Sequence, residues 1–95
     1  MMRFEWNEIK DEDNRRNRGF GFAFATLIFD GPVVERSDVR FPYGERRVVA
    51  VGCADAGYIT VVYTDRLDEF GPVRRIISAR PSNRREHLLY GKTQT

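Results

Sequence analysis

The segment from residue 33 to residue 79 constrains the fold most, because short stretches rich in β-branched residues alternate there with turn-forming residues. Runs of this kind predict an antiparallel meander, in which each strand pairs with the next one along the chain. The strands are predicted at residues 33–36, 46–51, 58–64 and 73–79. The connections are predicted as a turn at Pro42-Tyr43-Gly44, a hairpin turn at 54–57 and a polar loop at 65–72. A chain of 95 residues has room for one core, so we expect a single domain spanning residues 1–95.

The N-terminal part adds a strand and helices to this meander. Residues 3–6 alternate like a short strand. Asn7 and Gly19 stand where the N-cap and C-cap of a first helix would fall. Residues 20–29 fit two patterns, because their phenylalanines alternate as in a strand while their apolar residues also follow helical spacing. The alanine and leucine residues of this stretch favour a helix.

The C-terminal part ends in a short helix, opened by Pro81 and Ser82. Asn83 and Glu86 have the spacing of a reciprocal capping pair for that helix. We therefore expect an α+β fold, with a small, mostly antiparallel sheet packed with two N-terminal helices and a short C-terminal helix.

Charge is distributed unevenly along the chain. Residues 1–70 hold 10 of the 16 basic and 13 of the 14 acidic residues, a net charge of −3. Residues 71–95 hold 6 basic residues and one acid, Glu86, a net charge of +5. The basic residues are mostly arginine, whose planar fork grips phosphate in two places. A basic C-terminal quarter of this composition predicts a polyanionic partner, against the simpler alternative of a solvated charged surface.

Several classes of protein are disfavoured. Cys53 is the single cysteine, which excludes an internal disulfide and a cysteine-based metal site, and we interpret it as a small apolar filler. His87 is the single histidine, and Gly19-Phe20-Gly21 lacks the third glycine of a dinucleotide fingerprint. We therefore expect no metal and no cofactor. No apolar run approaches the roughly 20 residues of a membrane span, and the first residues lack a signal-peptide core. These features predict a cytoplasmic protein with no membrane partner.

The arginines of the C-terminal quarter are expected to gather at the end of the last strand. Simple alternation puts Arg74, Ile76, Ser78 and Arg80 on one face of that strand and Arg75, Ile77 and Ala79 on the other. Arg80 would then emerge beside Arg84 and Arg85, on the first turn of the final helix. Guanidinium groups held together in this way stabilise the charge that develops on a phosphate during its transfer.

The same residues carry a resemblance to a known family. Arg75-Ile76-Ile77-Ser78-Ala79-Arg80, followed by Arg84-Arg85-Glu86 and Tyr90, resembles the C-terminal signature of the BrnT family of type II toxins. Further matching motifs occur in the family's order along nearly the whole chain: Phe4-Glu5-Trp6 with Lys10 and Asn14, Phe29-Asp30 with Pro32, Glu45-Arg46 with Val51-Gly52, and Val61-Val62-Tyr63-Thr64-Asp65-Arg66.

This resemblance implies a RelE-like fold and a helix, rather than a strand, at residues 22–29. It also implies a metal-independent endoribonuclease that cleaves mRNA by attack of the ribose 2′-hydroxyl and so inhibits translation and growth. The partner would be a BrnA-like antitoxin. The toxin itself would not bind DNA and would be associated with it only through the antitoxin. The family usually has Lys-His-Gly where this chain has Asn17-Arg18-Gly19, and guanidinium holds its proton too tightly to act as a base.

For the expected site, the resemblance and the charge pattern assign the following roles. Phosphate binding and charge stabilisation fall to Arg66, Arg80, Arg84 and Arg85. Thr64 is expected to position the RNA by hydrogen bonding. His87 is the first candidate for acid or base catalysis, since histidine ordinarily titrates near neutrality, with Lys10, Tyr63 and Tyr90 as alternatives. Further RNA-binding residues are expected to be Lys10, Arg18, Arg74 and Arg75. The alternative is a non-catalytic module whose basic face docks RNA or an acidic partner.

Overall fold

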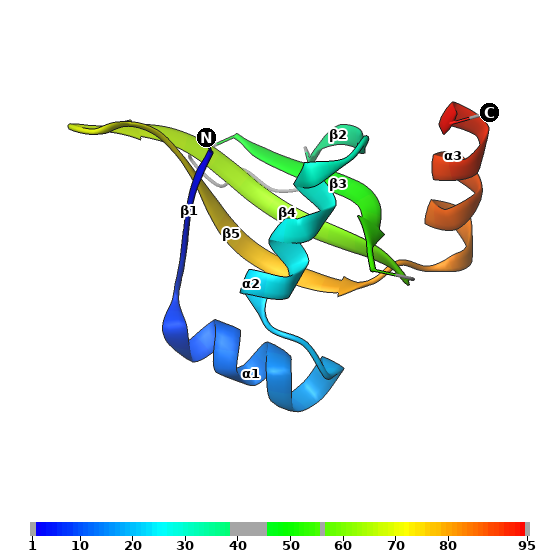
Figure 1. Cartoon of the computed structure of the whole chain (residues 1–95), viewed down its shortest axis with the longest axis horizontal. Coiled ribbons are helices and arrows are strands. Elements are labelled where there is room, and N and C mark those ends of the chain that lie inside the picture. Colours follow the sequence, from blue (N-terminus) through cyan, green and yellow to red (C-terminus); the bar gives the residue numbers. More distant parts are fainter. Residues whose placement is uncertain (1, 39–45, 56, 95) are drawn as a thin grey trace.

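A computed structural model describes residues 2–38, 46–55 and 57–94 of the protein. Within these ranges, five strands form one mixed sheet in the order β1-β5-β4-β3-β2 (Figure 1). The strands are β1 (Arg3–Trp6), β2 (Val34–Asp38), β3 (Arg47–Ala54), β4 (Gly57–Asp68) and β5 (Gly71–Pro81). β1 pairs with β5 in parallel, and the other neighbours pair antiparallel. The helices are α1 (Glu8–Arg18), α2 (Phe22–Ala25) and α3 (Arg84–Gln94), and a 3₁₀ helix, η1 (Thr26–Asp30), follows α2 directly. The predicted α+β class with a mostly antiparallel sheet is confirmed.

The caps predicted for α1 are confirmed. The side chain of Asn7 accepts hydrogen bonds from the backbone N–H groups of Ile9 and Lys10, at 2.9 and 3.1 Å. Gly19 ends the helix in the left-handed conformation, with φ of 83°. The stretch that follows is helical, as the resemblance implied: α2 and η1 together occupy residues 22–30.

The predicted loop at residues 65–72 is wrong. β4 continues to Asp68 and β5 begins at Gly71, so two residues connect the strands. The Asp68 carboxylate accepts a hydrogen bond from the backbone N–H of Phe70 at 2.8 Å, and Gly71 has φ of 110°. Polar side chains line these strand ends because the strands run into solvent, and such polarity in the sequence also favours a loop. The turn predicted at 42–44 lies outside the described residues.

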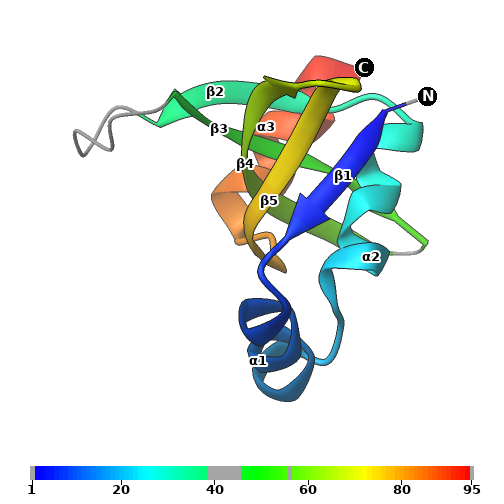
Figure 2. The ribbon, with the colours of Figure 1, turned by 90° about the vertical axis from the view of Figure 1, so that its left-hand side faces the viewer.

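One face of the sheet, the helix-covered face, carries the core. Phe22, Ala25 and Ile28 from α2 and η1 are almost completely buried against it. The strand residues of this core cluster are Ala50, Ala54, Ile59, Val61, Tyr63, Ile76 and Ala79. Burying a side chain the size of Phe22 or Ile28 stabilises the fold by about 1.5–3 kcal/mol. Figure 2 shows α2 on one side of the sheet and α1 below it, next to the end of β1.

A β-bulge in β5 changes which residues share a face. Tyr63 pairs with Ile76 while Val62 pairs with Ser78, so Ile77 is an extra residue without a partner in β4. Arg75, Ser78 and Arg80 therefore lie on one face, and Arg74, Ile76 and Ala79 lie on the other. The predicted alternation was wrong at this point, because it continued the period of two through the extra residue.

The opposite face of the sheet, the open face, is defined here by Thr60, Val62, Thr64 and Arg66 of β4 with Arg75, Ser78 and Arg80 of β5. α3 packs on this side of the sheet against β3 and β2, and at the end of the open face Tyr58 contacts the rings of His87 and Tyr90. Cys53, the register partner of Tyr58, is exposed, so it is not the apolar filler that we predicted. No helix in the described ranges has the length and apolarity of a membrane span.

Gly52 marks the closest approach of η1 to the sheet. We expect Gly52→Ala to lower the free energy of unfolding by about 1–3 kcal/mol. The added Cβ would lie 2.8 Å from Ile28 Cβ and 3.0 Å from Val33 Cγ1. Gly57→Ala is the matched control, because its Cβ would meet no atom nearer than 3.9 Å. Urea unfolding of both variants checks the prediction, and equal losses would contradict it.

Candidate active-site surface

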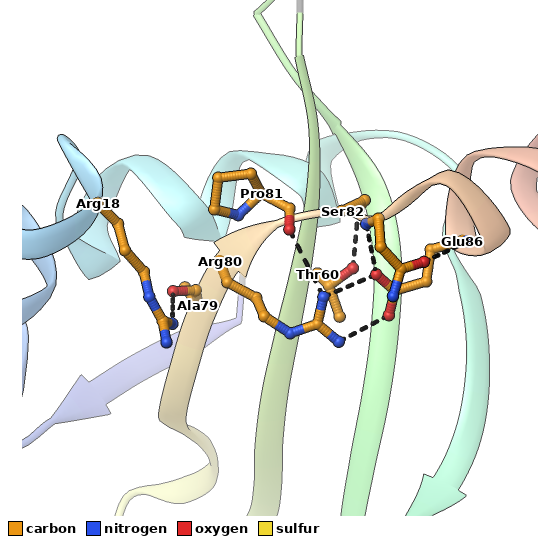
Figure 3. A network of polar contacts seen from close by, with 8 residues as sticks. Arg18, Thr60, Ala79, Arg80, Pro81, Ser82 and Glu86 are labelled. Carbon is orange, nitrogen blue, oxygen red and sulfur yellow. Dashed lines mark hydrogen bonds and ion pairs between the residues drawn. The ribbon is translucent and has the colours of Figure 1, made fainter.

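Arg80 and Glu86 form the central ion pair of the open face (Figure 3). Nη1 and Nη2 of Arg80 donate to Oε1 and Oε2 of Glu86 at 2.7 and 2.8 Å. The carboxylate side chain is only 10% exposed, whereas that of the arginine is 36% exposed. Parallel bonds of this kind fix the plane of a guanidinium group as well as its position.

Glu86 also joins α3 to the sheet. Its Oε1 accepts a hydrogen bond from the backbone N–H of Asn83 at 2.8 Å, and the Asn83 side chain accepts one from the N–H of Glu86 at 2.9 Å. This confirms the predicted capping pair. The hydroxyl groups of Thr60 and Ser82 lie 2.7 Å apart beside it, and Thr60 also hydrogen-bonds to Glu86. We call these five residues, Thr60, Arg80, Ser82, Asn83 and Glu86, the Arg80 network.

The surroundings of Glu86 keep its carboxylate ionised. Burial acts to raise the pKa of Glu86, but the hydrogen bonds from Arg80 and the Asn83 backbone, and the charge of Arg80, outweigh it and bring the pKa to about 2. The Arg80 network therefore holds a charged pair over the whole range from mildly acidic to neutral pH.

Arg80 retains hydrogen-bonding capacity on its exposed side. A guanidinium group has five N–H donors, and the donors that bond to Glu86 are on Nη1 and Nη2, at the far end of the group. The Nε–H and the outer N–H of Nη2 form a second fork along the side of the group, and within the described part of the chain neither donates a further hydrogen bond. This side fork has the geometry that binds two oxygens of a phosphate.

Arg84, Arg85 and His87 lie close to this network in α3, and all three are exposed. Arg84 and Arg85 occupy the first turn of the helix, directly after the Asn83 cap. The ring of His87 contacts that of Tyr58, with centroids 4.5 Å apart. Tyr58 is two residues before Thr60 in β4, and Thr60 is the register partner of Arg80. His87 is thus placed on the same side of the sheet as the Arg80 network.

A second ion-pair cluster lies nearer the other end of the open face. Glu5 of β1 pairs with Arg66 of β4 and with Arg75 of β5, the latter at 3.0 Å. The hydrogen bond from Arg66 is the main cause of a lowered pKa of Glu5, and Arg75 adds to it against the effect of burial. Arg75 and Arg80 are five residues apart in β5, which corresponds to roughly 15 Å of strand. The structure thus separates Arg66 from the arginines with which the sequence grouped it.

Thr64 lies on the open face but is buried. Its hydroxyl donates a hydrogen bond to the backbone carbonyl of Arg46 at 2.7 Å, which ties β4 to the start of β3. The side chain is thus engaged within the protein.

Arg74 is the predicted site residue that the structure removes from this surface. The bulge places it on the helix-covered face, where it pairs with Asp65 through two bonds of 2.8 Å. Its guanidinium carbon lies 3.9 Å from the ring centroid of Tyr63. Tyr63 itself donates to Glu35, and burial, followed by this hydrogen bond, raises the pKa of its hydroxyl. The predicted placement of Arg74 on the same face as Arg80 was therefore wrong.

Lys10 and Arg18 lie on α1, beside the edge of β5. β1 pairs with β5 only as far as Ile76, so the edge is open beyond that residue. Arg18 Nη1 donates to the backbone carbonyl of Ala79 at 2.6 Å, and Figure 3 shows Arg18 on one side of β5 while the side chain of Arg80 extends from the strand on the other. Lys10 lines a cavity between α1 and this edge.

Sequence reasoning missed the role of acidic residues in this surface. Glu5 and Glu86 hold three of the predicted arginines, yet Glu86 was assigned only as a helix cap and Glu5 had no role. One signal was present for Glu86, since it is the single acid among the basic residues of the C-terminal quarter. Glu5 offered none, because its partners are 61 and 70 positions away.

A small α+β protein that holds arginines in fixed positions on an open sheet face is suited to binding a polyanionic ligand. The model of a family described as the ribonuclease toxin BrnT of type II toxin-antitoxin systems matches residues 6–86. The chain belongs to this family of ribonuclease toxins, as its sequence motifs indicated. No curated protein matches the chain.

Proposed function

We propose that the open face is the site of metal-independent endoribonucleolytic cleavage. The ribose 2′-oxygen attacks the adjacent phosphorus, and the bond from phosphorus to the 5′-oxygen breaks. The 2′-hydroxyl loses its proton, the leaving oxygen gains one, and the products carry a 2′,3′-cyclic phosphate and a 5′-hydroxyl. The family membership supports the ribonuclease activity, and the arginine geometry supports its location.

The observation that carries this proposal is the side fork of Arg80. Glu86 holds the guanidinium at two points, so binding a phosphate does not require the side chain to be ordered at that moment. Preorganised donors of this kind stabilise charge that develops in the transition state. Arg84 and Arg85 add positive charge from the first turn of α3.

The flanking RNA is proposed to run along the open face towards Arg75 and Arg66. Both guanidinium groups are partly exposed although they pair with Glu5. Arg18 extends the same basic surface at the β5 edge. We assign Thr64 a supporting role, since its hydroxyl fixes the strand that carries Arg66.

His87 is the proposed acid or base. Its exposed imidazole lies on Tyr58, near the Arg80 network, and histidine is suited to proton transfer at neutral pH. Tyr63 faces the other side of the sheet, and its pKa is raised by burial. Tyr90 donates to the carbonyl of Pro32 at 3.1 Å, and burial likewise raises its pKa. Both tyrosines are therefore poorer candidates than His87.

In the cell, we propose that the RelE-like domain acts in the cytoplasm on mRNA, inhibits translation and growth, and is neutralised by a BrnA-like antitoxin. The support is the family, whose members function with an antitoxin. The open face, with the exposed Arg84 and Arg85, is the natural surface for an acidic antitoxin segment to cover.

The chemistry of the cut tests the proposal. We expect purified protein to cleave short single-stranded RNA in the presence of EDTA and to leave 2′,3′-cyclic phosphate ends, detected by mass spectrometry. A 2′-deoxy substitution at the cleaved position should block the cut, because it removes the attacking oxygen. Cleavage next to the 2′-deoxy residue would refute this route. Loss of all RNA cleavage in EDTA would refute it as well.

The rival function is a module that binds RNA or protein without cutting. The observation in its favour is that Arg66, Arg75 and Arg80 all pair with carboxylates, which lowers the charge available to the reaction. RNA that is bound but stays intact during prolonged incubation would select this alternative.

A further inference from the structure

The face of α1 that looks towards the sheet edge is polar. Lys10, Asp13, Asn14 and Asn17 have the helical spacing that places them on one face, and all four line a cavity between α1 and β5. A helix packed on a protein body usually presents apolar residues to it. The apolar residue of α1, Ile9, is instead 73% exposed. The polar face therefore needs an explanation other than packing.

Hydrogen bonds, not apolar contacts, attach α1 to the rest of the protein. The buried carboxylate of Asp11 accepts from the backbone N–H of Phe22 at 2.7 Å, and Asn14 donates to the carbonyl of Phe20 at 2.9 Å. Arg18 bonds to the edge of β5 from the last turn. These three hydrogen bonds fix the position of α1 beside β5, and the cavity lies between the two elements.

The cavity has a volume of about 300 Å³ and two kinds of wall. Ile77, the bulged residue of β5, forms an apolar wall, with the almost completely buried Phe22 behind it. The opposite wall carries the ammonium group of Lys10, the carboxylate of Asp13 and the amide of Asn17. Within the described part of the chain, these three side chains make no hydrogen bond or ion pair. Apolar walls with a few unpaired polar groups are typical of a small-ligand site.

This cavity is continuous with the proposed cleavage surface. Ser78 lines it and lies on the open face, two residues before Arg80, which is about 7 Å along the strand. Arg18 also lines it, on the other side of β5 from Arg80. A strand of RNA with a phosphate on Arg80 would thus pass the mouth of the cavity.

We infer that the cavity between α1 and β5 binds one nucleobase of the RNA substrate, an inference that rests on the proposed ribonuclease function. The base would be one that carries both an amino group and a carbonyl oxygen, namely guanine or cytosine. Its amino group donates to Asp13, and its carbonyl oxygen accepts from Lys10 or Asn17. One of its faces lies against Ile77. Adenine lacks the carbonyl oxygen, and uracil lacks the amino group.

A nucleobase fits these walls better than a segment of the antitoxin does. The apolar wall at Ile77 accepts one face of a planar ring, and the base brings donors and acceptors on one edge. Single-stranded RNA also presents its bases free of pairing.

The test uses 2′-O-methyl RNA heptamers, which lack the attacking hydroxyl and stay intact, with fluorescence anisotropy as the binding measurement. Each position carries in turn guanine, cytosine, adenine, uracil or an abasic residue. At one position we expect wild-type protein to bind guanine or cytosine about tenfold more tightly than adenine or uracil. Asp13→Asn should reduce this preference to less than about twofold.

Glu12→Gln is the matched control, because it removes the same charge from the outer face of α1, where Glu12 pairs with Arg16. The control should keep the full preference. A base preference that survives in Asp13→Asn overturns the inference, and so does the lack of any position where the base changes the affinity. Neither outcome contradicts the proposed RNA cleavage. Wild-type protein that neither binds nor cleaves these sequences as ordinary RNA would overturn the proposed function as well.

Discussion

Arg80→Ala is expected to slow RNA cleavage by roughly 100- to 1,000-fold, the usual effect of removing one preorganised donor to a transition state. The side fork of Arg80 is the proposed phosphate-binding group of the open face, and Glu86 fixes its plane. Single-turnover cleavage of a short RNA, with enzyme in excess over substrate, measures the chemical step directly.

Two variants separate charge from geometry in this prediction. Arg80→Lys keeps the positive charge but loses the bidentate geometry, so we expect it to retain part of the defect. Arg16→Ala removes an exposed arginine that pairs with Glu12 on α1, and it should cleave at the wild-type rate. A folded Arg80→Ala protein with wild-type single-turnover kinetics would exclude Arg80 from the reaction.

Glu86→Ala is expected to lower the free energy of unfolding by roughly 2–3 kcal/mol. The loss of the cap on α3 accounts for about 1 kcal/mol. Removing one partner of a fully buried ion pair costs roughly 3–5 kcal/mol. The loss of the pair with Arg80 should cost less than that, because the Arg80 side chain is 36% exposed and solvent screens its charge. Urea unfolding gives the value. Glu12→Ala, which breaks an exposed pair, should change stability by less than about 0.5 kcal/mol.

The same carboxylate gives the stability a pH dependence with a defined sign. The pKa of Glu86 is about 2 in the folded protein and lies near 4.3 in an unfolded chain. The unfolded state therefore takes up the proton first as the solution is acidified. The contribution of Glu86 is fully present above about pH 4.5 and is lost between there and pH 2. Wild-type protein should lose more stability than Glu86→Gln in this window, and parallel losses would contradict the assigned pKa.

Local sequence signals were sufficient for most of the secondary structure. The caps at Asn7 and Gly19 and the Asn83–Glu86 pair depend on interactions within a few residues, so the chain shows them directly. The strands followed from β-branched runs in the same way. Residues 20–29 were undecided by periodicity, because α2 gives way to a 3₁₀ helix, whose period differs from that of an α-helix.

The candidate site was less predictable, since it depends on one bulge and on distant partners. Ile77 has no side-chain property that marks it as the extra residue, and its insertion moved Arg74 to the helix-covered face. The pairing of Glu5 with Arg75 spans 70 positions. Contacts of this kind are determined by the sheet order, which the sequence pattern did not specify for β1.

The parallel pairing of β1 with β5 also determines when the fold can form. β1 waits for a strand that follows about 70 residues later, so its pairing closes the longest loop of the sheet. Long-range closure slows folding, and β5 follows all the other strands in the chain. Glu5 can gather Arg66 and Arg75 only after this closure. The positions of Arg66 and Arg75 therefore depend on the longest loop closure of the sheet rather than on their neighbours in the sequence.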